Sequence, residues 1–175
     1  KKMLKKIPEN EKIDVLDLCT GSGAIAISIK KYFENEKRLK IMASDISVKA
    51  LEVAKKNLAD ILGDENSISW LNKDLLNDIT EKFDLIVSNP PYIKTSDLES
   101  LPSDVKHEPV LALDGGNDGL TMYKRIRENV KNNMKSSSVL MMEIGYNQKY
   151  DVMSIFEGSK CLKDLAQNDR VIIWK

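Results

Sequence analysis

The tetrapeptide Asn-Pro-Pro-Tyr at residues 89–92 directly follows the mostly apolar run 83–88, Phe-Asp-Leu-Ile-Val-Ser. Two consecutive prolines exclude a helix and a central strand there, because proline has no N–H to donate and its φ is fixed near −65°. The run therefore ends in a rigid turn that carries a carboxamide at Asn89 and an aromatic ring at Tyr92. Such a turn can aim fixed hydrogen-bond acceptors at a bound group, as catalytic sites require.

A second candidate site is the stretch 17–23, Asp-Leu-Cys-Thr-Gly-Ser-Gly, which lies at the end of another apolar run. Gly21 and Gly23 permit a tight turn and a close approach of the backbone to a ligand. A plain strand-to-helix turn explains the two glycines equally well. Asp45 favours a ligand, because it ends the next predicted strand 22 residues after Gly23, where a carboxylate can accept both hydroxyls of a ribose.

The residues around the glycines limit the kind of cofactor. The stretch lacks both the Gly-Lys-Ser/Thr of a phosphate-binding loop and the third glycine of a dinucleotide-binding turn. Asp17 would repel a pyrophosphate at the helix N-terminus, but it suits a cationic amino group. S-adenosylmethionine has such a group, a sulfonium and a ribose. Asp74 can accept from its adenine amino group with Leu75 beside the ring; the alternative is a loop acid that caps a turn.

The elements that precede these groups must hold them in place. Apolar runs that suit strands alternate with stripes that suit helices, which predicts a doubly wound α/β sheet. Nearly continuous apolar strands indicate that helices cover both faces of the sheet. Ligands of such sheets bind at the carboxyl ends of the strands, where both candidate sites lie. Strands are expected at residues 13–18, 41–44, 68–71, 83–88, 139–142 and 171–174.

Helices are expected after the glycine turn, from an N-cap at Ser47, and over residues 147–156. A further helical stripe starts after Gly119 with Met122 and runs through Met134.

Residues 93–119 show little periodicity and contain prolines and glycines. Loops of that length in compact domains are typical of functional or mobile segments, and we expect this one to be a lid over the 89–92 turn. His107, the only histidine, is expected to be structural or on the surface. Glu108 either orders the loop beside a substrate or anchors local structure.

Composition excludes several classes of protein. A chain of 175 residues fits one domain with its own core. Lys plus Arg and Asp plus Glu both number 27, so no overall basic field would attract nucleic acid. Two cysteines, Cys19 and Cys161, make neither a disulfide framework nor a metal site. No apolar run reaches the roughly 20 residues that span a membrane. We predict a cytoplasmic monomer without a metal site.

The sequence resembles the class I S-adenosylmethionine-dependent methyltransferases. Within that group it resembles the HemK/PrmC family, the protein-(glutamine-N5) methyltransferases that modify peptide chain release factors. Asn-Pro-Pro-Tyr followed by Glu-Pro and Asp-Gly-Gly-x-Asp-Gly-Leu is the most specific part of the resemblance, which covers nearly the whole chain. Its other segments are VLDLCTGSGAIAI, SDIS, LMMEIGYNQ and NDRVI.

The resemblance implies a Rossmann-like α/β fold with a mostly parallel seven-stranded sheet and an antiparallel C-terminal strand. It implies one catalytic domain over 1–175, in which the family's N-terminal helical docking domain is not recognisable. Cys19 stands where the generic motif has its first glycine, and a small residue can still fit there. The implied cofactor is S-adenosylmethionine, and its product is S-adenosylhomocysteine. The implied cofactor-binding residues are Asp17, Cys19, Thr20, Gly21, Ser22, Gly23, Asp45, Ile46, Asp74, Leu75 and Asn89.

The substrate site implied by the resemblance is the turn Asn89, Pro90, Pro91 and Tyr92, with Asn89, Pro90 and Tyr92 as catalytic residues. The Asn89 side-chain oxygen and the Pro90 carbonyl can each accept one N–H of a glutamine amide, while Tyr92 stacks on the amide plane. These acceptors stabilise the positive charge that develops on nitrogen as the new bond forms. A methylated, cationic amide loses its proton readily, so no strong base is needed.

Three other functions share these residues. A nucleic-acid N-methyltransferase could hold adenine or guanine in the same turn, but zero net charge and a short chain disfavour it. A ribosomal protein could supply the glutamine in place of a release factor. A cofactor-binding scaffold without activity is disfavoured by the presence of Asp17, Asp45, Asn89 and Tyr92.

Overall fold

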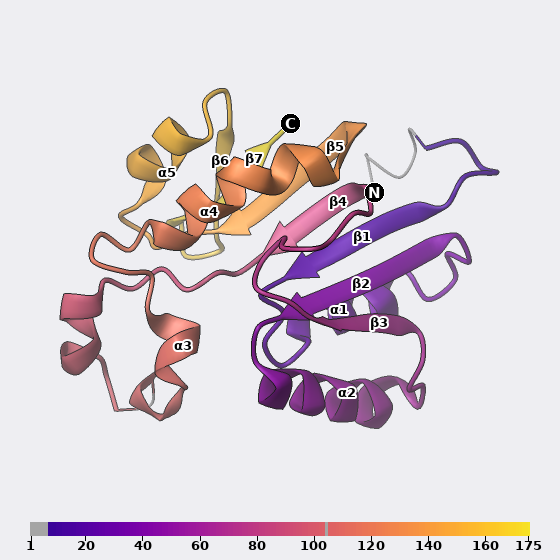
Figure 1. Cartoon of the computed structure of the whole chain (residues 1–175), viewed down its shortest axis with the longest axis horizontal. Helices are drawn as coiled ribbons and strands as arrows, with labels where there is room; N and C mark the ends of the chain where they lie inside the picture. The colour runs from indigo at the N-terminus through magenta and orange to yellow at the C-terminus, as the bar shows by residue number, and fades with distance from the viewer. Residues whose placement is uncertain (1–6, 104) are drawn as a thin grey trace. The chain divides into compact units, whose positions relative to one another are not determined.

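A computed structural model describes residues 7–103 and 105–175, so the expected domain start at Lys1 lies outside the described residues. The chain forms a seven-stranded sheet of order β3-β2-β1-β4-β5-β7-β6 (Figure 1). The strands are β1 (Ile13–Leu18), β2 (Leu39–Asp45), β3 (Ile68–Asn72), β4 (Phe83–Ser88), β5 (Met134–Glu143), β6 (Lys160–Lys163) and β7 (Asp169–Trp174).

The strand directions confirm the predicted mixed sheet. β2 pairs in parallel with β1 and β3, whereas β7 pairs antiparallel with both β5 and β6. The six strands expected from the sequence are all present, with shifts at their ends. No apolar run predicts β6, because its four residues, Lys-Cys-Leu-Lys, carry two charges and are mostly exposed.

The helices are α1 (Ala24–Tyr32), α2 (Val48–Leu62), α3 (Val110–Leu113), α4 (Thr121–Asn129) and α5 (Lys149–Ile155), with 3-10 turns η2 (Thr95–Ser100), η3 (Val105–His107) and η4 (Val130–Asn133). The N-cap prediction is confirmed, because the Ser47 side chain accepts from Ala50 N. The helical stripe through Met134 is wrong at its end. α4 stops at Asn129, η4 follows, and Met134 opens β5.

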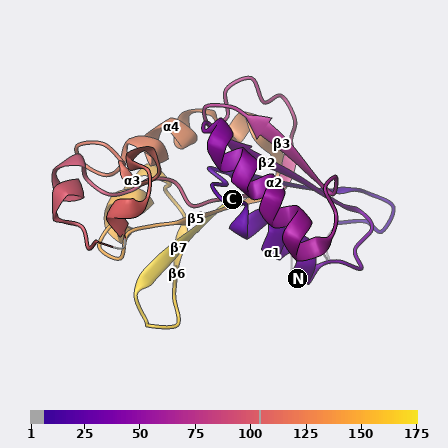
Figure 2. The same cartoon turned by 90° about the horizontal axis from the view of Figure 1, so that it is seen from below.

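The described chain divides into two compact units. The first comprises the described residues up to Val87 together with Asn133–Ser138, and the second comprises Ser88–Asn132 and Val139–Lys175, apart from the undescribed position 104. In the first unit α1 and α2 contact each other, and both contact β2 (Figure 2). In the second unit α4 contacts α5, and α5 packs against β6 and β7.

A lysine joins three strands of the first unit near their amino ends. Lys135 Nζ lies 2.8 Å from Asp14 Oδ2 and 2.7 Å from Asp84 Oδ2, and Asp14 N donates to the same Asp84 oxygen at 2.8 Å. Asp14, Asp84 and Lys135 lie on β1, β4 and β5, respectively. Because the Asp84 side chain is only 7% exposed, the ion pair with Lys135 compensates for the burial of this carboxylate.

Aromatic residues pack in or against the core of each unit. In the first, Trp70 on β3 packs against a core that includes Leu58 and Ile68. In the second, the buried Trp174 ring meets Phe156 edge-on and has Arg127 and Lys131 within 4.9 and 5.5 Å of its centroid.

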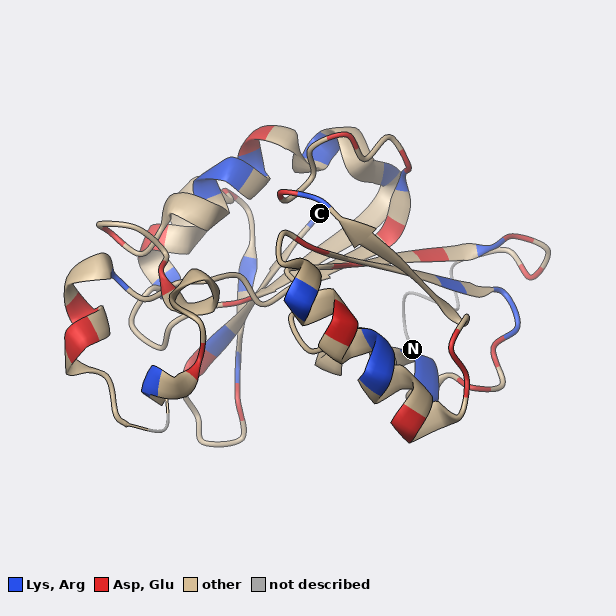
Figure 3. Cartoon of the chain, turned by 60° about the horizontal axis from the view of Figure 1, so that its bottom comes forward, with Lys and Arg blue, Asp and Glu red and all other residues tan. Residues whose placement is uncertain are grey.

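Lysine residues and acidic residues are interspersed along α2, the helix in the foreground of Figure 3. None of the helices formed by the described residues combines the length and apolarity needed to cross a membrane.

Candidate active site

The glycine turn follows β1 in the chain and is hydrogen-bonded to the end of β2 within the first unit. Cys19, Gly21 and Gly23 have φ values of 59°, 56° and 82°, so three positions of one short turn are left-handed. Thr20 N donates to Ser44 O at 3.0 Å, and Gly21 N donates to Asp45 Oδ2 at 2.8 Å. The parallel pairing of β1 with β2 thus places the glycines beside Asp45, as the sequence predicts.

The two glycines have different neighbours. A Cβ added at Gly21 meets no atom within 4 Å, so this backbone faces open space that a ligand can enter. A Cβ at Gly23 would lie 3.0 Å from Ala54 Cβ and Ile27 Cδ1, and 3.2 Å from the ring tip of Trp70. Gly21 therefore suits ligand approach, whereas Gly23 allows the start of α1 to pack closely against its neighbours.

Asp17 lies beneath the turn and is fully buried. Its Oδ2 accepts from Thr20 Oγ1 at 2.6 Å and from Ala26 N at 2.9 Å, while Oδ1 has no partner among the described residues. Burial raises the pKa of this carboxyl to about 6, because the charged form is poorly solvated. A buried carboxylate with an unsatisfied oxygen attracts a cationic group near the turn.

Asp45 keeps acceptor capacity for a ligand. Its Oδ2 accepts from Gly21 N, and its Oδ1 accepts from Ser47 N at 2.9 Å. A carboxylate has about four lone-pair sites, so each oxygen can accept one further hydrogen bond. The adjacent Ile46 is 50% exposed and offers an apolar surface beside the carboxylate.

Two asparagines that sequence reasoning missed hold these loops. Asn72 Nδ2 donates to the carbonyl of Asp45 at 3.0 Å and to that of Ile46 at 2.8 Å. Asn57 Nδ2 donates to Ser22 O at 2.9 Å. Asn72 could have been noticed as a polar residue at the carboxyl end of a strand, but Asn57 lies within α2 and gives no comparable signal.

The expected place of Leu75 beside an adenine ring stays a prediction, and the structure shows only how the residue packs. Leu75 has a φ of 52° and is only 8% exposed, so its side chain packs inward. Asp74, which precedes it, is half-buried in the same turn. Ile46, rather than Leu75, therefore presents the larger exposed apolar surface near the end of β2.

The 89–92 turn opens the second unit. Asn89 is exposed and Pro90 is buried, and no described residue donates a hydrogen bond to the Asn89 side chain or the Pro90 carbonyl. Both acceptors therefore lack a hydrogen-bond partner among the described residues. Tyr92 is half-buried, and its hydroxyl donates to Glu143 Oε1 at 3.4 Å. Burial and the nearby Glu143 carboxylate raise the pKa of Tyr92, so its phenol stays neutral.

Two glycines of the Asp-Gly-Gly-Asn-Asp-Gly stretch, Gly115 and Gly119, lie close to the backbone of Tyr92. A Cβ at Gly115 would lie 2.7 Å from Tyr92 Cα, and one at Gly119 would lie 2.6 Å from Tyr92 O. Ile93 N donates to Leu113 O at 2.9 Å, and Gly115 N donates to Ile93 O at 2.7 Å. Only glycines permit such close backbone contacts.

The 93–119 segment contains more structure than the sequence suggested. It includes η2, η3 and α3, and the contacts of Ile93 join its two ends. Its function as a lid stays a prediction. His107 is exposed at the end of η3, which confirms the expected surface position. Glu108 is exposed too, and its role stays open.

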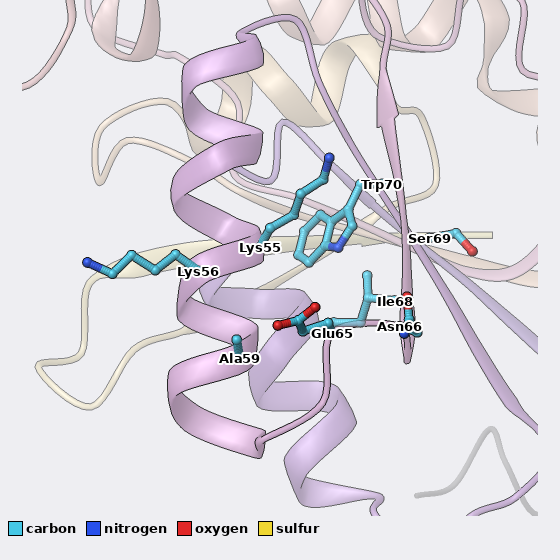
Figure 4. Close-up of a pocket in the computed structure, with 8 residues that line it drawn as sticks. All are labelled: Lys55, Lys56, Ala59, Glu65, Asn66, Ile68, Ser69 and Trp70. Atoms are coloured by element: carbon cyan, nitrogen blue, oxygen red, sulfur yellow. The ribbon is translucent and has the colours of Figure 1, made fainter.

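A separate cavity of about 700 Å³ lies between α2 and β3 (Figure 4). None of the predicted site residues lines it. Its lining consists of Lys55, Lys56, Ala59, Glu65, Asn66, Ile68, Ser69 and Trp70.

Residues 1–110 match the family model described as methyltransferase small domain. The chain belongs to this family. A release factor glutamine methyltransferase of Clostridium acetobutylicum is 40% identical over 98% of this methyltransferase chain and 62% of its own length. A ribosomal protein uL3 glutamine methyltransferase of Neisseria meningitidis is 42% identical over 77% of this chain and 43% of its own length.

The chain thus spans about three fifths or less of the length of these curated relatives. Their names confirm the resemblance to glutamine methyltransferases that the motifs indicate.

Solved structures show the same fold. The structure of a methyltransferase from Pyrococcus furiosus superposes on 98% of this chain with a TM-score of 0.65 and 16% sequence identity, and the match covers 78% of the Pyrococcus chain. The structure of TrmN from Thermus thermophilus superposes on 98% of this chain with a TM-score of 0.65 and 17% sequence identity, and the match covers 46% of the TrmN chain. The predicted class I methyltransferase fold is confirmed.

Proposed function

We propose that this chain transfers a methyl group from S-adenosylmethionine to the side-chain amide nitrogen of a glutamine in a peptide chain release factor. The observation that carries the proposal is the 89–92 turn, where two unengaged acceptors lie at the end of a buried strand. The name of the Clostridium acetobutylicum relative supports the substrate.

The first unit fits the cofactor in four respects. Gly21 faces open space, Asp45 keeps two acceptor sites for ribose hydroxyls, and Ile46 offers an apolar surface for a purine. The unsatisfied oxygen of Asp17 supplies negative potential for the amino group. When bound, S-adenosylmethionine supplies an electrophilic methyl group on a positively charged sulfur.

The residues of the 89–92 turn act by orienting the acceptor nitrogen. The Asn89 oxygen and the Pro90 carbonyl each accept one N–H of the glutamine amide, which turns the nitrogen lone pair in a fixed direction. Tyr92 covers the amide plane and excludes water. Positioning of this kind contributes on the order of 7–11 kcal/mol to a transfer between two bound reactants. The same two oxygens stabilise the positive charge that grows on nitrogen.

Two alternative substrates are retained. A ribosomal-protein glutamine is supported by the name of the Neisseria meningitidis relative. A nucleic-acid base would fit the same acceptors, although the balanced charge of the chain offers little attraction for nucleic acid. We propose a protein substrate, a monomeric enzyme and a cytoplasmic location, which the two free cysteines favour.

The test is methylation of purified release factor, ribosomal proteins, rRNA and DNA with labelled S-adenosylmethionine, followed by mass spectrometry of the product. We expect one glutamine of the release factor to gain the mass of a single CH₂ group, because a methyl group replaces one hydrogen of the amide. Label found only in nucleic acid would refute the proposal.

The role of Asn89 is tested by Asn89→Ala, with Asn132→Ala as a matched control at an exposed asparagine of the same unit. We expect Asn89→Ala to abolish turnover and keep most of the cofactor affinity measured by calorimetry. Near-normal turnover of Asn89→Ala would contradict the role.

A further inference from the structure

A buried glutamine outside the predicted site contacts the backbone of the substrate turn. Gln148, which precedes α5, is only 7% exposed. Its Nε2 donates to Tyr92 O at 3.0 Å and to Gly119 O at 3.1 Å. Its Oε1 accepts from Gly145 N at 2.9 Å. One carboxamide thus joins three loops of the second unit, and both of its ends are engaged.

A neutral carboxamide matches these three partners. Two carbonyls need donors and one N–H needs an acceptor, and a glutamine amide supplies two N–H groups and an oxygen in one plane. The neighbouring glycines leave the space for it. A Cβ at Gly119 would lie 2.8 Å from Gln148 Nε2, and a Cβ at Gly145 would lie 2.8 Å from Gln148 Oε1.

The hydrogen bond from Gln148 to the Tyr92 carbonyl restricts the backbone of the 89–92 turn. Fixing this carbonyl fixes the peptide plane between Tyr92 and Ile93, and Ile93 is held on the other side by Leu113 and Gly115. Pro90 and Pro91 have restricted φ angles. Few backbone rotations therefore remain between the anchored carbonyl of Tyr92 and the Pro90 carbonyl, which is one of the two acceptors assigned to the substrate.

We propose that Gln148 is a positioning residue that holds the 89–92 turn in its acceptor geometry by anchoring the carbonyl of Tyr92. The inference rests on the proposed function for its effect on turnover, and on the hydrogen bonds alone for its effect on the turn. Loss of the anchor lets the two acceptors move, and a displacement near 1 Å lowers rates by about 100-fold.

The main test compares Gln148→Leu with Asn147→Ala, a control at the exposed neighbouring residue. With labelled S-adenosylmethionine and purified release factor, we expect kcat of Gln148→Leu to fall about 10- to 100-fold. The calorimetric Kd for S-adenosylhomocysteine should change much less than kcat, because Gly21 and Asp45 belong to the first unit and Asn89 is the one assigned cofactor group in the affected turn. Wild-type kcat in Gln148→Leu would overturn the proposal.

Hydrogen exchange separates this inference from the proposed function, because it needs no substrate. In Gln148→Leu we expect faster exchange of the amides at 92–95, while residues 13–18 keep their protection. Unchanged exchange at 92–95 would overturn the inference even if the enzyme methylates release factor. If the wild type methylates no release factor but exchange rises at 92–95, the proposed function alone fails.

A second variant covers the case in which Gln148→Leu does not fold. Gln148→Glu keeps an oxygen for Gly145 N but places a carboxylate against the carbonyls of Tyr92 and Gly119. Protonation restores one donor, so we expect the kcat of this variant to rise as the pH is lowered from 8 to 6, relative to wild type. A kcat ratio that does not change with pH would contradict the anchoring role.

Discussion

Asp17 illustrates how a single side chain can stabilise a binding turn and still carry an energetic cost. Its carboxylate holds Thr20 and the first turn of α1, but one of its oxygens is buried without a partner among the described residues. The sequence predicts a charge suited to a cation at this position. The sequence did not reveal the complete burial of Asp17, because burial depends on how the turn folds over the strand end.

The raised pKa of Asp17 predicts a dependence of stability on pH. The folded carboxyl has a pKa of about 6, compared with 3.8 as its ordinary value, so the folded state binds the proton more tightly. Stability from this group therefore rises as the pH falls from about 6 to 4, and it is lost as the pH rises through 6. The difference is about 3 kcal/mol, at 1.36 kcal/mol per unit of pKa.

Urea unfolding of the cofactor-free protein between pH 4 and 7.5 measures this contribution, with Asp17→Asn as the reference. The difference in the free energy of unfolding between the two proteins should change by about 2 kcal/mol between pH 4 and 7.5, because pH 4 does not fully protonate the unfolded carboxyl. Parallel profiles for the two proteins would show that Asp17 titrates normally.

The two glycines of the turn should respond differently to alanine. Gly21→Ala should lower the free energy of unfolding by about 1–2 kcal/mol, because the added Cβ meets no neighbour and only the left-handed φ is unfavourable. Gly23→Ala has that cost and also forces contacts near 3.0 Å with Ala54 and Ile27, so we expect a loss of more than about 3 kcal/mol. Thermal and urea unfolding measure both values. Equal losses would mean that the space around the two positions does not differ.

At the scale of elements, long apolar runs were the reliable guide. β1, β2 and β4 follow from such runs, and Asp45 and Asn89 could be placed because each stands at or just beyond a strand end. Short elements could not be found in this way. β6 has only four residues, and η2, η3 and α3 have no buried face long enough to give a period.

The site could be predicted only in part for a related reason. Residues at strand ends are predictable, since parallel strands bring their carboxyl ends to one edge of a sheet. Supporting residues such as Asn57 and Gln148 act through backbone carbonyls of distant loops. No local pattern encodes such contacts.

The lysine that joins β1, β4 and β5 gives a prediction at this scale. Lys135→Met leaves the buried Asp84 charge without its partner, and we expect a loss of about 2 kcal/mol, reduced from the fully buried case because Lys135 is one third exposed. Lys40→Met, at an exposed residue of β2, is the control. Chemical unfolding should show little change for Lys40→Met. A similar small change for Lys135→Met would mean that solvent already screens Asp84.

At the scale of the whole molecule, the proposed function assigns different chemical roles to the two units. The groups assigned to the cofactor lie in the first unit, apart from Asn89, and the acceptor turn with its supports lies in the second. Neither set contains a group that must act as a strong base. His107, the only histidine, is exposed in η3.

This distribution predicts a flat pH profile for the chemical step. Asp17 titrates near 6, and burial raises the pKa of Tyr92 above its usual value, so neither has its midpoint between about pH 6.5 and 8.5. Rapid-quench measurement of single turnovers at saturating cofactor should give nearly constant rates in that window. A steep bell-shaped profile would reveal a titrating catalyst.

The two tryptophans lie in different units and in different surroundings. The ring tip of Trp70 lies close to Gly23 of the glycine turn, whereas Trp174 is buried beneath Arg127 and Lys131. Their fluorescence therefore reports on separate parts of the protein. If the first unit binds the proposed cofactor, we expect emission from Trp70 to change with cofactor concentration in Trp174→Phe. In Trp70→Phe, we expect emission from Trp174 to change only when the second unit unfolds.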